Sequence, residues 1–161
     1  MRDGHPTNLG AASGIVAGLV AITPAAGFVS GPGPLVIGAV AGVICCYAVR
    51  LKSKFGYDDA LDVVGVHFVG GLVGSLMIGL FANPDFFEGD FLEGLFYGGG
   101  AKLLGEQALA NLAAIVWSFP VTLGIMWVLK QLIGVRVDEE TELVGLDFPQ
   151  HGETAYHEGV R

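Results

Sequence analysis

The sequence predicts an all-α membrane protein, a polytopic bundle of about four transmembrane helices with a short cytoplasmic tail. Three observations support this fold class. The mean hydropathy of the 161 residues is +0.61, and 52% of them are hydrophobic. Only 15% are charged, against roughly a quarter in soluble domains. The charged residues are also clustered, so that residues 4–49 contain none of them.

Four apolar segments are predicted to span the membrane, and together they make residues 1–134 a transmembrane region: 8–28, 34–50, 62–82 and 108–132. Each is close to the roughly 20 residues that cross the hydrocarbon core. None carries the polar stripe of a helix at a soluble protein's surface. Four helices that are apolar all round cannot bury one another in water, so a bilayer is the expected solvent.

Small residues recur every four positions in the first three segments: Gly10, Gly14 and Gly18, then Gly38 and Gly42, then Gly70 and Gly74. Such spacing lets neighbouring membrane helices cross closely. Near the end of the first segment, Thr23 precedes Pro24. The Thr23 hydroxyl either satisfies backbone groups near that proline or faces a pore, and the sequence leaves both open.

The third segment contains the most informative residue, His67. An ionisable side chain inside a span is costly and usually faces a cavity or a partner. Imidazole exchanges protons closest to neutral pH, and its neutral form both donates and accepts a hydrogen bond. We therefore expect a pore or proton-relay role, with a single interhelical hydrogen bond as the alternative.

Three aspartates, Asp58, Asp59 and Asp62, precede this histidine. Asp62 is expected to cap the third helix and to favour its positive N-terminal end, rather than to act in catalysis. Asp58 and Asp59 are expected to cap the same helix or to pair with Lys52 and Lys54.

The distribution of Lys and Arg predicts that both termini lie in the cytoplasm of a multi-pass cell-membrane protein. The cations on that side are Arg2, Arg50, Lys52, Lys54, Lys130 and Arg136, whereas the outer loop 83–106 has only Lys102. That loop has aromatic residues suited to the membrane interface: Phe86, Phe87, Phe91, Phe96 and Tyr97. The tail, 135–161, is polar and acidic, and its Gly, Pro and aromatic content favours specific turns.

Several functional classes are disfavoured by the residues present. The chain has no basic face for nucleic acid, no phosphate-binding loop, no nucleophile–base pair and no metal cluster in its sequence pattern. Its two cysteines, Cys45 and Cys46, are adjacent within an apolar run and are expected to pack or to face lipid. We therefore expect no enzyme and no cofactor.

Three sequence blocks, 10–27, 58–67 and 145–156, resemble the Amt/Mep/Rh family of ammonium transporters, in family order. The match is to the C-terminal portion, which comprises the last four spans and the cytoplasmic tail. The resemblance implies that His67 is the inner of two paired pore histidines. It also implies that Val16, Thr23 and Val63 line the pore. The tail signature is carried by Gly145, Asp147, His151, Gly152 and Tyr156.

The resemblance further implies transport of ammonium or ammonia, a homotrimer with one pore per subunit, and a PII-type signalling protein docking near the tail. Phe68 replaces the glycine that is common after the histidine, and Pro149 stands where plant relatives carry a phosphorylatable threonine. Because only part of the family fold is matched, we expect a fragment or one half of a transporter. The alternatives are a non-conducting regulatory subunit whose tail binds a partner, and an unrelated four-helix membrane protein.

Overall fold

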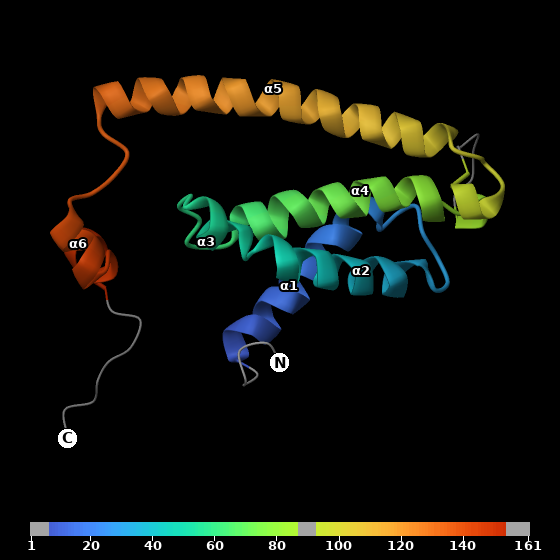
Figure 1. The fold of residues 1–161 in the computed structure, drawn as a ribbon, viewed down its shortest axis with the longest axis horizontal. Helices are drawn as coiled ribbons and strands as arrows, with labels where there is room; N and C mark the ends of the chain where they lie inside the picture. Colours follow the sequence, from blue (N-terminus) through green and yellow to red (C-terminus); the bar gives the residue numbers. More distant parts are fainter. Residues whose placement is uncertain (1–6, 87–92, 154–161) are drawn as a thin grey trace. The chain divides into compact units, whose positions relative to one another are not determined.

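The computed structural model describes residues 7–86 and 93–153, and this part of the chain is helical without strands. The helices, drawn in Figure 1, are α1 (Asn8–Ala25), α2 (Gly33–Ala48), α3 (Leu51–Phe55), η1 (Val63–Phe68), α4 (Val69–Phe81), η2 (Pro84–Phe86), η3 (Leu95–Tyr97), α5 (Lys102–Leu132), α6 (Glu139–Val144) and η4 (Asp147–His151). The chain divides into two compact units, Met1–Ala114 and Ile115–Arg161, and α5 begins in the first and continues in the second. Four residues named in the sequence expectations lie outside the described residues: Arg2, Phe87, Phe91 and Tyr156.

Four helical stretches are long and apolar enough to cross a membrane: Asn8–Ala25, Gly33–Phe55, Val63–Phe81 and Lys102–Leu132. The predicted all-α fold with four spans is therefore confirmed. The fourth span begins six residues before its expected start, because its first turns are polar and hydropathy alone does not detect them. The first helix ends three residues early, directly after Pro24, which cannot donate a backbone hydrogen bond.

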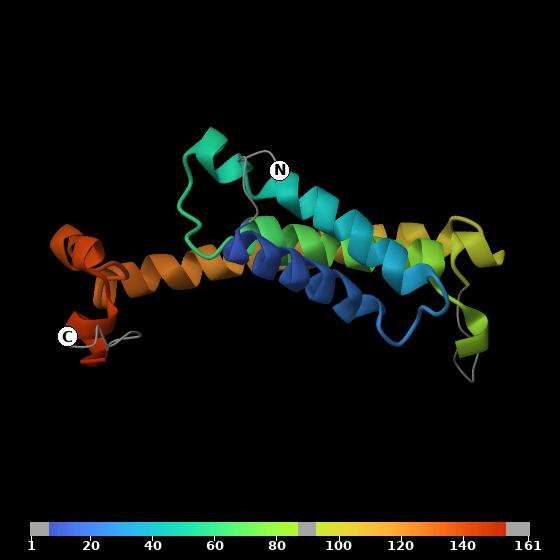
Figure 2. The ribbon, with the colours of Figure 1, turned by 90° about the horizontal axis from the view of Figure 1, so that it is seen from below.

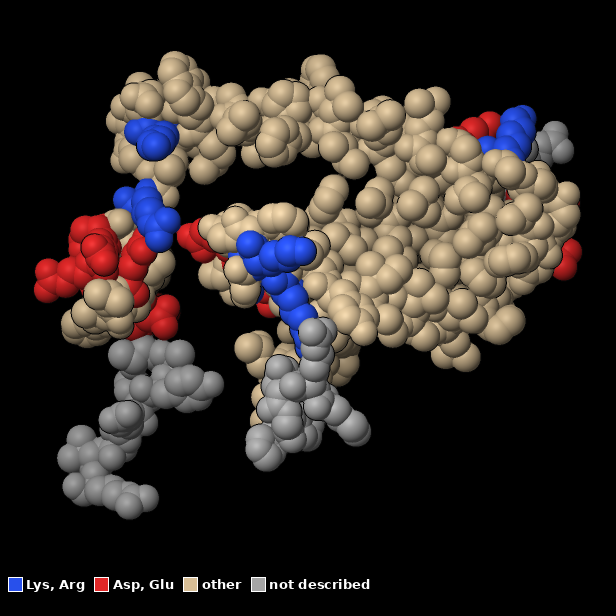
Figure 3. All heavy atoms as spheres, in the orientation of Figure 1, with Lys and Arg blue, Asp and Glu red and all other residues tan. Residues whose placement is uncertain are grey.

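Charged side chains of the first unit gather at its two ends, and the surface between them is tan in the view of Figure 3. One end follows α2 and carries Arg50, Lys52 and Lys54. The other end precedes α5 and carries Lys102 and Glu106. An uncharged band between two charged ends is the pattern that a bilayer requires, since a charge in the hydrocarbon core is costly.

The core of the first unit forms where α1, α2 and α4 pack side by side, as both ribbon views show (Figures 1 and 2). Small side chains, including the fully buried Ala21 and Ala41, bring the three helices close together. The tightest approach is at Gly74, where an added Cβ would lie 1.9 Å from the Ala21 carbonyl oxygen. Gly65 is similarly close to Val49, at 2.8 Å from its Cα. Glycine is therefore required at these two crossings.

The glycine repeats of the first two segments do not mark such crossings. A Cβ added at Gly14, Gly18, Gly38 or Gly42 would meet no described atom within 4 Å. The expectation of close helix crossings thus holds for Gly74 in the third segment but is wrong for these four glycines within the described residues. They leave open surface between side chains instead.

Polar side chains join α4 to the first part of α5. The Ser75 hydroxyl donates to Gln107 Oε1 at 2.8 Å, and Asn111 Nδ2 donates to Ser75 Oγ at 3.1 Å. Gly79 allows Leu104 to approach, since a Cβ there would lie 2.4 Å from the Leu104 Cα. Hydrogen bonds between membrane helices are each worth about 0.6–2 kcal/mol. The sequence analysis did not detect this network, although Gln107 and Asn111 stand one turn apart where the apolar part of α5 begins.

A second polar group ties the turn after α1 to the end of α4. Asn83 is buried, and its side chain donates to the Ser30 hydroxyl while its backbone N–H donates to the Phe28 carbonyl at 2.9 Å. Val29 and Ala82 form an isolated antiparallel bridge beside it. These contacts close the bundle at this end, and both polar atoms of the Asn83 side chain have partners, since its Oδ1 accepts from the Asp85 backbone N–H.

The tail of the second unit forms two short helical turns. Asp138 caps α6 by accepting from the Thr141 backbone N–H at 2.8 Å, and Arg136 forms a two-pronged ion pair with Glu142. Gly145 ends α6 with a φ of 98°, and Gly152 ends η4 with a φ of 65°. Of the tail-signature residues, Gly145 and Gly152 thus occupy left-handed backbone positions that favour glycine. Asp147 and His151 are the first and last residues of η4.

Acidification is expected to unfold α6, because its cap and its ion pair both need ionised carboxylates. The Arg136 guanidinium holds the pKa of the Glu142 carboxyl below its ordinary value, and the Thr141 backbone N–H does the same for the pKa of Asp138. Since both folded-state pKa values are lowered, their stabilisation is complete above the ordinary carboxyl pKa and is lost as pH falls through the folded values. A pH titration followed by NMR should show the Thr141 amide signal changing over that acidic range. Arg136→Gln should return the Glu142 titration to its ordinary range, and an unchanged Glu142 titration would contradict the ion pair.

Candidate functional site

The segment that carries His67 is a π-helix. In η1 the Val69 backbone N–H donates to the Val64 carbonyl, five residues earlier, in place of the usual four. Asp62, which precedes η1, has a left-handed backbone with a φ of 55°, uncommon for a residue other than glycine. Short π-helical turns occur frequently at functional sites. The local backbone is therefore unusual at the position where the sequence indicated function.

The start of η1 is capped by Asp59. Its two carboxylate oxygens accept from the backbone N–H groups of Val63 at 2.7 Å and Val64 at 2.9 Å. Asp62 stands at the N-cap position but makes no side-chain cap bond. Its carboxylate instead forms an ion pair with Lys52, which also donates to the Asp59 carbonyl.

The expectation that Asp62 caps the third helix is therefore wrong. The physical reason is that the Asp59 carboxylate already accepts from the first free backbone N–H groups of η1, those of Val63 and Val64. The Asp62 carboxylate forms its ion pair with Lys52 instead. Asp58 lies in the same loop with its side chain exposed. The sequence has three aspartates before this helix, and residue type alone does not determine which carboxylate accepts from the first backbone N–H groups.

Removing the cap should destabilise η1. Asp59→Ala is expected to cost about 0.5–2 kcal/mol of folding free energy, because two backbone N–H groups lose their acceptors. Faster hydrogen exchange should appear first at the amides of Val63 and Val64. Asp59→Asn should keep the cap at one of these two N–H groups and lose it at the other, because an amide side chain has one acceptor oxygen and its Nδ2 only donates. Equal exchange rates at Val63 in the wild type and in Asp59→Ala would contradict this assignment.

The candidate pore residues all lie on surface that the described chain leaves uncovered. His67 is exposed and lies one turn from Val63, which is 50% exposed. On α1, Val16 is 38% exposed and Thr23 is exposed two turns further along. The structure places Val63 with His67 on one helical stretch and Val16 with Thr23 on another, and α1 packs against both η1 and α4 (Figure 2).

Three side chains near this surface have contacts or exposure that the sequence had left open. The Thr23 hydroxyl donates to the Leu19 carbonyl at 2.7 Å, four residues back in its own helix. Pro24 has no N–H to donate to the Val20 carbonyl, four residues earlier, and the Thr23 hydroxyl does not replace that hydrogen bond. Phe68 is 48% exposed, so its ring lies outside the described core. The thiol of Cys45, buried behind η1, lies 3.9 Å from the Val66 carbonyl, a weak contact that residue spacing did not indicate.

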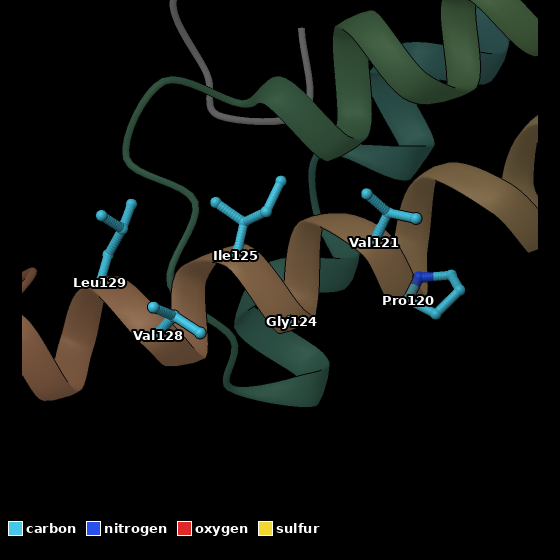
Figure 4. A pocket seen from close by; sticks show the side chains of 6 residues that line it. All are labelled: Pro120, Val121, Gly124, Ile125, Val128 and Leu129. Carbon is cyan, nitrogen blue, oxygen red and sulfur yellow. The ribbon is translucent and has the colours of Figure 1, made fainter.

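An apolar hollow of about 360 Å³ on α5 is a poorer candidate site. It is lined by Pro120, Val121, Gly124, Ile125, Val128 and Leu129, with Val121, Ile125 and Leu129 projecting from the same side of the helix (Figure 4). All six lining residues are apolar, and a ligand site needs a few polar groups that fix orientation. Within the described residues there is also no cluster of side chains that could hold a metal ion.

Comparison with known proteins identifies the family. A sequence model described as the Ammonium Transporter Family matches residues 1–156. The chain belongs to the ammonium transporter family. This confirms the resemblance inferred from the motifs, and with the four apolar helices it makes the chain a membrane protein.

Relatives in this family show how much of it the chain covers. The ammonium transporter of Mycobacterium tuberculosis is 52% identical over 160 residues, covering 97% of this chain and 34% of that protein. The Bacillus subtilis ammonium transporter is 46% identical, covering 96% of this chain and 38% of that protein. The crystal structure of Saccharomyces cerevisiae Mep2 matches with a TM-score of 0.78 and 36% identity, covering 86% of this chain and 32% of that one. The chain therefore spans about a third of the length of these ammonium transporter family members.

Proposed function

We propose that this chain forms the C-terminal wall of a pore that conducts ammonium or ammonia across the cell membrane. One observation carries the proposal. In a member of the ammonium transporter family, the four expected pore residues, Val16, Thr23, Val63 and His67, all lie on surface that the described chain does not cover. Such a surface is complete only when further membrane helices face it, and the relatives are about three times longer than this chain.

The chemistry of this wall suits a small, weakly basic substrate. Val16 and Val63 offer apolar walls, which disfavour hydrated metal cations because these would lose their water without compensation. Neutral ammonia loses far less on entering such a conduit. His67 is the only ionisable side chain between Val63 and Phe81, and its imidazole can accept or return a proton on the path. The substrate class is thus set by an apolar conduit with one proton-exchanging group.

Assembly and orientation extend the proposal. The excess of Lys and Arg at the end that follows α2 favours a cytoplasmic position for that end and for both termini. We assign the tail, 135–161, to the cytoplasm as a regulatory segment. The capped helix α6 and the turn of η4 hold several acidic residues in a defined backbone conformation: Asp138, Glu139, Glu140, Glu142 and Asp147. We propose that a PII-type protein docks on this acidic surface. A homotrimer with one pore per subunit is the proposed assembly.

The test is uptake of labelled methylammonium in cells that lack their own ammonium transporters. The chain is expressed alone, then with the remaining two thirds of the Mycobacterium tuberculosis relative, and that partial relative is expressed alone as the control. Uptake only when both parts are present is the expected result. If both parts reach the membrane together and no uptake follows, the chain is better described as a non-conducting regulatory subunit.

A further inference from the structure

Lys52, the second residue of α3, contacts both of the aspartates that shape the start of η1. Its ammonium group forms an ion pair with the Asp62 carboxylate and donates to the Asp59 backbone carbonyl at 3.1 Å. The two paired side chains are only 31% and 21% exposed, so water screens their attraction less than at an open surface. One cation therefore joins α3 to the residues that precede the π-helix.

The backbone of Asp62 needs such a contact. In the described part of the chain, Asp62 is the one residue other than glycine with a positive φ, 55°. A Cβ makes this left-handed conformation unfavourable, so it persists where neighbouring groups hold it. The backbone carbonyl of Asp62 accepts from the Val66 N–H at 2.7 Å. The ion pair with Lys52 thus holds the residue from which the first hydrogen bonds of η1 start.

The residue at which η1 begins determines where the His67 side chain points. Successive residues of a helix are about 100° apart around its axis, so a shift of one residue would turn His67 to another side. The packed side of η1 is set by close contact, because a Cβ at Gly65 would lie 2.8 Å from the Val49 Cα and Val66 is buried. His67 stays exposed only while this register is kept.

We propose that Lys52 is a positioning residue for His67, because its ion pair with Asp62 fixes where the π-helix begins. This inference rests on the proposed role of His67 in the pore. The effect of Lys52 passes through Asp62 and the η1 backbone to the imidazole. If the ion pair only stabilised the loop, its loss would change the amount of folded protein and leave the imidazole in place.

The first test is an NMR spectrum of the full chain in detergent micelles, with labelled histidine rings and with the His67 signals assigned through His67→Ala. Lys52→Met removes the charge and keeps an unbranched stem, and it should move the His67 signals. Lys54→Met is the matched control, because Lys54 is a cation of the same helix whose ammonium lies 5.9 Å from the Phe55 ring. It should leave the signals in place, and circular dichroism should show equal helix content in both variants.

Substitutions at Asp62 test whether Lys52 acts through this residue. Asp62→Gly should leave the His67 signals near their original positions, because glycine adopts a positive φ without steric cost. Asp62→Ala should move them, since alanine has neither the ion pair nor this freedom. Lys52→Met should have a smaller effect in the Asp62→Gly background than in the original chain. Equal effects of Lys52→Met in the two backgrounds would overturn the proposal.

Methylammonium uptake by the completed transporter gives the functional readout. Lys52→Met should lower the maximal rate about tenfold at equal membrane levels, because misplacing a reacting group by about 1 Å can cost up to about 100-fold. Lys52→Arg should retain most of the rate. If the transporter without substitutions shows no uptake, the proposed function fails, and the NMR result still decides whether Lys52 positions His67. Unmoved His67 signals in Lys52→Met, equal changes in Lys54→Met, or a loss of helix content in Lys52→Met would overturn the positioning role alone.

Discussion

Replacing Gly74 by leucine is expected to separate α1 from α4 and to prevent the bundle from folding. Even a Cβ at this position would lie 1.9 Å from the Ala21 carbonyl oxygen and 2.7 Å from its carbon. These are backbone atoms of a packed helix, so they cannot turn aside as the end of a side chain can. Overpacking of a core costs about 1–3 kcal/mol, and a clash with backbone should exceed that range.

The measurement is the free energy of unfolding in mixed micelles, followed by circular dichroism as denaturing detergent is added. Gly74→Ala should lose about 3 kcal/mol or more, and Gly74→Leu should not reach the folded state. Gly71→Ala is the control, because it lies in the same helix and its added methyl would meet nothing within 4 Å. Alanine should raise helix propensity there by about 1 kcal/mol. Equal stability of the two alanine variants would show that α1 and α4 do not cross at Gly74.

Replacing His67 by alanine is expected to reduce methylammonium uptake by the completed transporter about 100-fold or more. A positioned group that exchanges protons contributes about that factor when the rate depends on it. No other ionisable side chain between Val63 and Phe81 could take its place. The loss should occur without a change in the amount of protein in the membrane, because the exposed His67 ring is not part of the described core.

Val64→Ala is the matched control for His67→Ala. Val64 lies in the same π-helix and is 41% exposed, but it has no assigned role in the pore. Its substitution should change uptake less than about threefold, within the range of small effects at exposed sites. If His67→Ala and Val64→Ala retain the same uptake at equal membrane levels, His67 does not face the conducting path.

The spans could be predicted from the sequence because a helix that crosses the hydrocarbon core needs about 20 consecutive, mostly apolar residues, and hydropathy detects such a run directly. Hydropathy located all four helices within a few residues. It failed at the start of α5, where Lys102 and Glu106 continue the helix beyond the apolar region. It also could not separate glycines that allow a crossing, such as Gly74, from those that leave open surface, such as Gly42. That distinction depends on which helix faces each glycine.

The residues of the candidate site were chosen from the sequence, and their role in a pore stays a prediction. Motifs indicated His67, Val63, Val16 and Thr23, whereas their shared exposure required the fold. The sequence did not indicate that Asp59 would cap η1, that Asp62 would pair with Lys52, or that η1 would be a π-helix. These features depend on the conformation of the loop between α3 and η1, because that conformation determines which donors lie within hydrogen-bond distance of the two carboxylates.

The central claim is that this chain supplies one wall of an ammonium-conducting pore. The most direct test replaces the matching third of the Mycobacterium tuberculosis relative with this chain and measures methylammonium uptake into proteoliposomes that hold the purified chimera. We expect saturable uptake that ammonium inhibits and that potassium does not. A chimera that folds and inserts into the proteoliposomes yet takes up no more methylammonium than empty vesicles would contradict the claim.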